Sequence, residues 1–208
     1  KPFDAGKPIT KPAGGQVVPH GLALSDDFSR NKFGLQWSFF KAGANERERL
    51  NYRDGLLELT AKGDSPANSS PMSFLAGDQH YQFEVDIDVD AGAQAGALLF
   101  YNDKLYAGLG VSRRGLQLHR YGMDQRWSPL PEGMQGNSLR LRLSNKRHVL
   151  TLHTSVDQGK TWQKYGTQME VSGYHHNVAY GFMSLRPALY AAGQGKVRFR
   201  NLVYRALP

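Results

Sequence analysis

Apolar and polar residues alternate one by one along several stretches of this chain. The clearest is YQFEVDIDVD (81–90), in which every second residue is apolar and each residue between is Gln, Glu or Asp. GLLELTAK (55–62), SLRLRLS (138–144) and VRFRNLVYRAL (197–207) show the same period. Because neighbouring side chains of a strand point to opposite faces, this period predicts strands with one buried and one solvated face.

Two further stretches, AGALLFYND (95–103) and KLYAGLGVS (104–112), are apolar on both faces. A strand in the middle of a sheet that is covered on both sides shows this pattern. HVLTLHTSV (148–156) continues the set, and Gly, Asn, Asp and Pro separate the stretches. We find no long stretch with the three-to-four spacing of a helix. The pattern predicts an all-β protein, built as an antiparallel two-sheet β-sandwich.

The first 24 residues differ from the rest, because they contain four prolines and several glycines. Proline fixes φ and removes a hydrogen-bond donor, so this composition favours an extended connector. We expect residues 1–24 to be a linker and residues 25–208 to form the β-sandwich domain. A chain of 208 residues accommodates one such domain and a tail.

Composition and charge exclude several classes of protein. The chain has no cysteine, which removes disulfides and thiolate metal sites. Its net charge of +8 comes from 26 basic and 18 acidic residues that are spread along the chain, without a nucleic-acid-binding motif. No apolar run is long enough for a transmembrane helix. We therefore expect neither nucleic acid nor a membrane as a partner.

The stretch SVDQGKTW (155–162) matches the Asp-box pattern S-x-D-x-G-x-T-W. In such a hairpin Asp157 accepts backbone hydrogen bonds across the turn, Gly159 takes a positive φ and Trp162 returns to the core. Sialidases carry several such boxes, away from their catalytic residues, whereas this chain has one. We interpret the stretch as a stable hairpin.

The densest group of reactive side chains lies between Met169 and Gly193 and includes the pair His175 and His176. On a strand these imidazoles point to opposite faces, so they could ligate one metal ion only if the segment were a loop. Glu170 precedes the pair, and no acid close after it completes a set of ligands. We expect one His to be buried and hydrogen-bonded, and the other to face a ligand.

Signatures of catalysis are missing from the sequence. There is no G-x-S-x-G elbow and no P-loop, and Asp86 and Asp88 lie on a predicted solvated face rather than as a catalytic pair. What remains is a set of aromatic residues flanked by Asn, Arg, His and Gln. Such mixtures recognise sugars, because aromatic rings cover the C–H faces of pyranoses and planar polar groups bond to their hydroxyls. We nevertheless expect most of these aromatic residues to belong to the core, and Trp37 in GLQWSFF above all.

Taken together and in order, several blocks of the sequence resemble one family. The blocks are PHGLALSDDFSRNKFGLQWSFF, SPANSSP, LLFYNDKLYAGLG, SVDQGKTW, MEVSGYHHNVAYGFMSLRPALYAAG and VRFRNLVYRAL. They resemble the C-terminal β-sandwich of glycoside hydrolase family 43, the β-xylosidases and α-L-arabinofuranosidases, over nearly the whole chain. The resemblance implies a concanavalin A-like sandwich, similar to a xylan-directed carbohydrate-binding module. It also implies that residues 1–24 follow a catalytic propeller in the same polypeptide, and that this chain alone is not an enzyme.

Two functions agree with the resemblance. The chain is a non-catalytic accessory domain that binds xylan or xylo-oligosaccharide, or a structural domain that packs on the propeller and shapes its active site without binding free sugar. We expect a secreted or periplasmic bacterial protein. The candidate ligand-binding residues are Tyr101, Asn102, Tyr106, Trp127, Tyr174, His175, His176, Arg186 and Tyr190.

The resemblance also raises the question of a structural calcium ion, which some such sandwiches hold near the paired terminal strands. Asp26 and Asp27 could contribute to such a site. Arg198 and Arg200, however, stand where many relatives carry acidic residues on the last strand. Two cations there oppose calcium binding. We therefore expect no cofactor, with calcium at Asp26 and Asp27 as the alternative.

Overall fold

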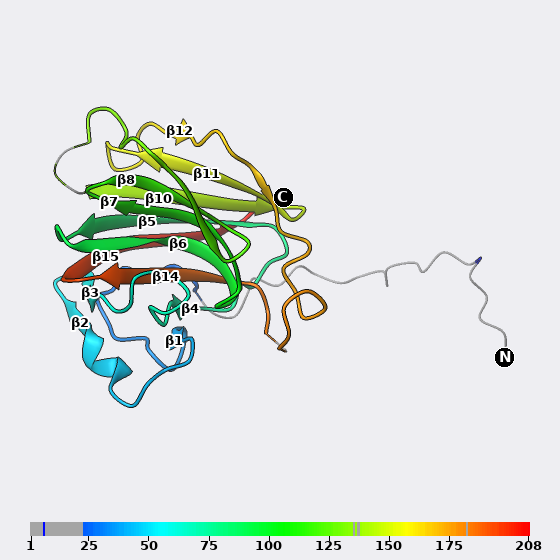
Figure 1. Cartoon of the computed structure of the whole chain (residues 1–208), viewed down its shortest axis with the longest axis horizontal. Coiled ribbons are helices and arrows are strands. Elements are labelled where there is room, and N and C mark those ends of the chain that lie inside the picture. Colours follow the sequence, from blue (N-terminus) through cyan, green and yellow to red (C-terminus); the bar gives the residue numbers. More distant parts are fainter. Residues whose placement is uncertain (1–5, 7–22, 135, 137, 182) are drawn as a thin grey trace.

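The computed structural model describes Gly6 and residues 23–134, 136, 138–181 and 183–208 of the chain. Two antiparallel sheets lie face to face (Figure 1), which confirms the predicted β-sandwich. Among the described residues, the helical structure consists of one 3-10 turn, η1 (Glu46–Arg49), and no helix is long and apolar enough to cross a membrane. The predicted linker falls almost wholly outside the described residues.

The first sheet has seven strands, and its middle strands are the two stretches that are apolar on both faces. Both are buried on both sides, as their pattern predicts. In spatial order the strands are β1 (Ser38–Phe39), β4 (Met72–Ser73), β14 (Arg186–Gly193), β6 (Ala93–Asn102), β7 (Leu105–Ser112), β8 (Gly115–Arg120) and β9 (Met123–Ser128).

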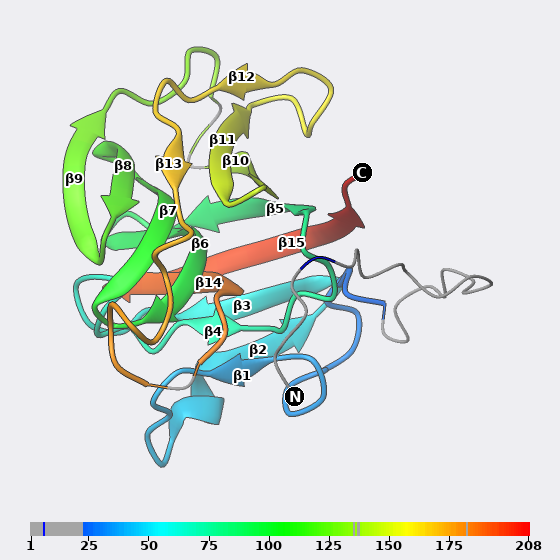
Figure 2. The same cartoon turned by 90° about the vertical axis from the view of Figure 1, so that its right-hand side faces the viewer.

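The second sheet has eight strands and contains the last strand of the chain, β15, in its middle between β5 and β3 (Figure 2). In spatial order its strands are β12 (Gln163–Lys164), β11 (Val149–Ser155), β10 (Ser138–Lys146), β5 (Tyr81–Val89), β15 (Lys196–Ala206), β3 (Leu56–Thr60) and β2 (Leu50–Arg53), with β13 (Met169–Glu170) also paired to β11.

The core lies between the inner faces of the two sheets. Alternation on β5 places Phe83, Val85 and Ile87 inside, where each is fully buried. Trp37 is 1% exposed, which confirms its predicted place in the core. Its ring meets the ring of Phe74 edge-on at a centroid distance of 4.9 Å, a favourable aromatic geometry.

The outer face of the eight-stranded sheet carries the charged residues that alternate with the core residues. The Arg140 guanidinium on β10 donates to Glu84 at 3.2 Å and to Asp86 at 2.8 Å, and Arg142 donates to Glu84 at 2.9 Å. On β15, Arg198 lies 3.0 Å from Asp90. Acidic and basic side chains on neighbouring strands therefore neutralise one another across this face.

Asp26 does not fit a calcium site. Its buried carboxylate accepts hydrogen bonds from the backbone N–H of Phe28 at 2.9 Å and from the indole N–H of Trp37 at 2.8 Å. The ammonium group of Lys32 lies 3.2 Å from the same carboxylate. A cation of the protein therefore already occupies the position that calcium would need. Asp27 is exposed, and its carboxylate bonds to Ser29 instead.

Candidate functional site

The outer face of the seven-stranded sheet combines an apolar patch with a polar network. Its apolar patch is buried, because Phe40 and Ala67 from the segments flanking β2 and β3 pack on it. This cover explains why β6 and β7 are apolar on both faces. The patch consists of Leu98, Phe100, Tyr106, Ala188, Tyr190 and Ala192.

A chain of polar side chains begins beside this patch. His119 on β8 is fully buried, and its Nδ1 lies 2.7 Å from the carboxylate of Asp124 on β9. Its Nε2 lies 2.8 Å from the hydroxyl of Tyr190 on β14. Both ring nitrogens thus have partners, which is what burial of an imidazole requires.

Gln94 extends the chain of hydrogen bonds across the sheet. Its amide nitrogen donates to the side-chain oxygen of Gln117, and the same nitrogen lies close to the Tyr190 hydroxyl above Gly110. The carboxylate of Asp124 requires a proton on Nδ1 of His119, so Nε2 accepts the Tyr190 proton. Burial raises the pKa of Tyr190 well above its ordinary value, which keeps the phenol protonated as this arrangement needs.

The Gly110 position leaves room for this network. A Cβ added at Gly110 would overlap the Tyr190 hydroxyl and would also approach the nitrogens of Gln94 and His119. The glycine therefore has a packing reason for its place on a middle strand.

A cleft of about 390 Å³ opens at the end of this network. Trp127 on β9 is half-buried, and the Arg114 guanidinium lies 4.9 Å from its ring centre. Gln94 lines the same cleft, so residues that carry an indole, a guanidinium and an amide border one concave surface. The lining residues are Asp64, Ala91, Gly92, Ala93, Gln94, Ser112, Arg113, Arg114, Trp127 and Gly193.

Among the candidates from the sequence, Trp127 lines this cleft, whereas Tyr106 and Tyr190 lie beneath the same face. The exposed fractions of Tyr106 and Tyr190 are 1% and 0%, so neither ring presents a face to solvent. Arg186 begins β14 on the same face, opposite Phe100, at the end away from Trp127. Its Nε donates to the Ser184 hydroxyl at 3.3 Å.

Tyr101 and Asn102, at the end of β6, hold the loop of residues 171–185. The Tyr101 hydroxyl donates to the carbonyl of Gly181. The Asn102 amide donates to the carbonyls of Ala179 and Tyr180 at 3.1 and 3.3 Å. Both side chains are buried, so their role in this structure is to position the loop.

Tyr174 ties the same loop to the turn between β8 and β9. Its hydroxyl accepts the backbone N–H of Tyr121 at 2.9 Å, and burial raises its pKa to about 12. Its ring is 3% exposed and packs against the Tyr121 ring at 5.5 Å. The loop is thus fixed at both of its sides, by Tyr174 and by Tyr101.

His175 and His176 lie in this loop and not on a strand. His175 is half-buried, and its Nδ1 accepts the backbone N–H of Asn177 at 3.2 Å. His176 is exposed, and the two rings meet edge-on at 5.8 Å. Within the part of the chain that the structure describes, no group of three His, Cys, Asp or Glu could hold a metal ion.

The tip of the loop presents apolar side chains to solvent. Tyr180 is 95% exposed and Val178 is 60% exposed. This tip extends from one end of the sandwich (Figure 1, orange). Large exposed apolar side chains on a well-anchored loop are typical of a contact surface.

The Asp-box hairpin forms as the sequence predicts, with one exception. The Asp157 carboxylate accepts the Thr161 backbone N–H at 2.9 Å and the Thr161 hydroxyl at 2.6 Å, and Gly159 has a φ of +89°. Trp162 does not return to the core, however. It is half-exposed and lies under the Arg142 guanidinium, 3.6 Å from its ring centre. Stacking on Arg142 replaces burial as the interaction that holds this ring.

Sequence reasoning missed His119, Gln94 and Arg114. A signal for His119 was present in GLQLHR (115–120), where Gln117 and His119 alternate with Leu116 and Leu118. Two polar residues on one face of a strand that follows apolar strands indicate a polar network on that face. No comparable signal points to Arg114, because its place depends on the turn between β7 and β8.

Known proteins share this fold. Residues 25–202 match the family described as the β-xylosidase C-terminal concanavalin A-like domain. A xylan β-1,4-xylosidase from Bacillus halodurans C-125 has 17% identity and a TM-score of 0.74, over 94% of this chain and 41% of that protein. The family 43 BlXynB protein from Bacillus licheniformis has 19% identity and a TM-score of 0.74, over 93% of this chain and 41% of that protein.

A family 43 protein, GH43B, from a xyloglucan utilisation locus of Bacteroides ovatus has 16% identity and a TM-score of 0.73, over 93% of this chain and 41% of that protein. The chain thus spans less than half the length of these structures. No curated protein sequence matches it. Because the family match extends over most of its length, this chain belongs to the β-xylosidase C-terminal concanavalin A-like domains.

Proposed function

We propose that this chain is the non-catalytic accessory domain of a family 43 glycoside hydrolase acting on xylan or arabinoxylan, and that it binds xylan in the Trp127 cleft. One observation carries the proposal: the half-buried Trp127, Arg114 and Gln94 together line one cleft. An indole face covers the C–H patch of a pyranose, and the planar groups of Arg114 and Gln94 suit its hydroxyls.

The network beneath the cleft supports this proposal. Gln94 is held by Gln117 and lies close to the Tyr190 hydroxyl, which is itself held by His119. A polar group that is aligned before the ligand arrives loses less conformational entropy on binding. In this proposal the buried Tyr106 and Tyr190 support the sheet face from below, and Trp127 is the residue that stacks on the sugar.

The acidic groups near the cleft favour binding over hydrolysis. Glycosidases place two carboxyl groups on either side of the scissile bond. Among the described residues that line the cleft, Asp64 is the one carboxylate, and it accepts a hydrogen bond from Asn68 at 2.7 Å. Catalysis is therefore assigned to the propeller that precedes this domain in the proposed full-length enzyme.

Replacing Trp127 by Ala is expected to weaken the binding of xylohexaose at least about tenfold, roughly 1.4 kcal/mol, because the stacking surface is lost. Calorimetric titration of the purified chain measures this effect. Trp162→Ala is the matched control, since it removes a half-exposed indole from the opposite sheet. Equal affinities of the wild type and Trp127→Ala for xylohexaose would remove the cleft from the proposal.

The exposed loop supports a second role, docking on the catalytic propeller. The observation that favours it is the 95% exposure of Tyr180 on a loop whose backbone is held by Tyr101 and Asn102. A rigid loop with an exposed aromatic tip suits a protein interface, where aromatic side chains contribute much of the binding energy.

Tyr180→Ser is expected to weaken association with a separately produced family 43 propeller about tenfold or more, because an aromatic anchor is lost. Binding of xylohexaose should not change. Leu35→Ser, which alters another side chain with 86% exposure, is the control. If Leu35→Ser weakens association as much as Tyr180→Ser, the loop has no special part in docking.

A further inference from the structure

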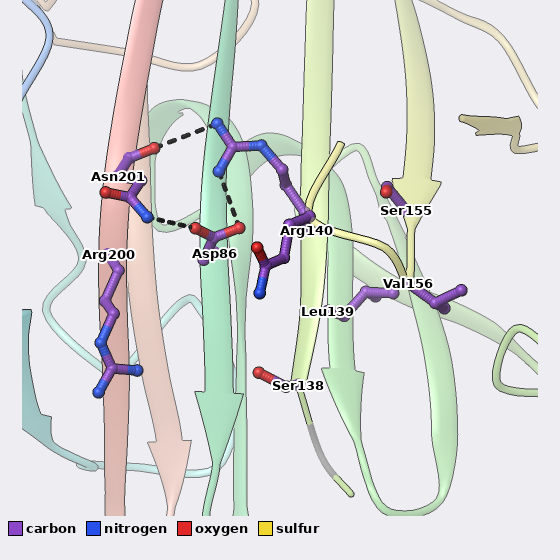
Figure 3. A pocket seen from close by; sticks show the side chains of 9 residues that line it. Asp86, Ser138, Leu139, Arg140, Ser155, Val156, Arg200 and Asn201 are labelled. Atoms are coloured by element: carbon purple, nitrogen blue, oxygen red, sulfur yellow. Dashed lines mark hydrogen bonds and ion pairs between the residues drawn. The ribbon is translucent and has the colours of Figure 1, made fainter. Parts of the chain in front are cut away.

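A second cleft, of about 430 Å³, lies on the outer face of the eight-stranded sheet (Figure 3). It crosses β15, β5, β10 and β11, far from Trp127, which belongs to the other sheet. Val156 and Gln158 of the Asp-box hairpin line one of its sides. The hairpin, which neither proposed role uses, therefore contributes to a concave surface.

A row of cross-strand neighbours forms the floor of this cleft. Arg200 is paired in register with Asp86, Asp86 with Arg140, and Arg140 with Ser155. Both oxygens of Asp86 are already engaged. Oδ1 accepts from Arg140 at 2.8 Å, and Oδ2 accepts from the Asn201 amide at 2.8 Å. Arg140 is further neutralised by Glu84 at 3.2 Å.

A bulge in β15 directly follows Arg200 and brings Asn201 to Asp86, the cross-strand neighbour of Arg200. The register shifts between Arg200 and Val203, and Asn201 takes a φ of +49°. This backbone turn places the Asn201 amide on Asp86, where an arginine would otherwise pair, and its carbonyl 3.3 Å from Arg140. Figure 3 shows the Arg200 side chain pointing away from this group of bonded residues.

The Arg200 guanidinium consequently has an unmatched charge. In the described part of the chain, no carboxylate forms an ion pair with it within 4.0 Å: Asp86 pairs with Arg140, and Asp88 lies 3.8 Å from Arg198. Arg200 is nevertheless half-buried and lines the cleft. A guanidinium in this position offers its planar donors to an anion from outside.

We propose that this cleft binds the carboxylate of a uronic acid residue in an acidic oligosaccharide. Arg200 would hold the carboxylate through two parallel hydrogen bonds, and Ser138 and Gln158 on the opposite side would bond to ring hydroxyls. One unmatched positive charge fits a monoanionic carboxylate better than a dianionic phosphate, which Asp86 would repel. This site goes beyond the proposed xylan cleft and does not depend on it.

The test compares three ligands by calorimetric titration of the purified chain. They are a xylotriose with one glucuronic acid branch, the same oligosaccharide with its carboxyl group reduced to an alcohol, and unbranched xylotriose. The acidic ligand is expected to bind most tightly, and Arg200→Gln should weaken it at least about tenfold through loss of a charge-assisted bidentate contact. Arg205→Gln, which removes the same charge from an exposed position further along β15, should leave the affinity unchanged.

The same titration in Trp127→Ala distinguishes the two clefts, since this variant should bind the acidic ligand through Arg200 as before while its binding of xylohexaose is weakened. The proposal is overturned if the acidic and reduced ligands bind equally, or if Arg200→Gln and Arg205→Gln have the same effect. It is also overturned if inorganic phosphate displaces the acidic ligand at equal concentration. Arg200-dependent binding of a propeller, without uronate binding, would assign Arg200 to a protein interface instead.

Discussion

Replacing Asp26 by Ala is expected to lower the free energy of unfolding by about 2–4 kcal/mol, because the buried Trp37 indole and the Phe28 backbone N–H lose their acceptor and the half-buried Lys32 loses its counter-ion. The carboxylate is 1% exposed and holds three groups at once: the Phe28 backbone, the Trp37 indole and the Lys32 ammonium. Without it, the indole N–H of a core residue has no partner, and the Lys32 charge is left beside the core.

Chemical denaturation of Asp26→Ala and of the wild type measures this loss. Asp27→Ala is the matched control, because the neighbouring carboxylate is exposed and bonds only within its own turn. Added calcium should not raise the melting temperature of the wild type, since Lys32 takes the cation position. An Asp26→Ala variant as stable as the wild type would show that this buried network contributes nothing.

The second large effect is expected at His119. His119→Ala should cost about 2–4 kcal/mol of stability, because it leaves a cavity and removes the partner of the buried Tyr190 hydroxyl. The substitution should also affect the cleft, since the Tyr190 hydroxyl that His119 holds lies close to the amide nitrogen of Gln94. The affinity for xylohexaose should therefore fall although His119 does not line the cleft.

His119→Phe separates the two causes. It keeps a ring of similar size but has neither nitrogen, so the loss that remains, about 1–3 kcal/mol, reports the hydrogen bonds alone. Thermal unfolding followed by titration with xylohexaose gives both quantities for each variant. If His119→Phe matches the wild type in stability and in affinity, the network does not position the cleft.

The alternation of apolar and polar residues predicted the two sheets well, because the two faces of each strand differ strongly in polarity. On β5 every inward residue is apolar and every outward residue is Gln, Glu or Asp, so the alternation alone identifies the buried face. The same reasoning could not say what covers β6 and β7. Their outer face is apolar because Phe40 and Ala67 pack on it, a contact between segments that are distant in the sequence.

The candidate site was harder to predict for a physical reason. Tyrosine can stack on a ligand, or bury its ring and direct its hydroxyl to a partner, and local sequence does not distinguish the two. Tyr101, Tyr174 and Tyr190 all bury their rings, and the hydroxyl of each one is hydrogen-bonded to another segment. Trp127 differs because it lies near the edge of the sheet on β9, and such a position depends on strand order.

The central position of β15 has a consequence for synthesis of the protein. β3 and β5 are made early, but they share a neighbour that consists of residues 196–206. The eight-stranded sheet can therefore close only after that last strand has left the ribosome. Until then two strand edges stay open to pairing with other chains, and non-local pairing of this kind is slow. Synthesis at low temperature, or a chaperone that shields strand edges, should favour a high yield of folded domain.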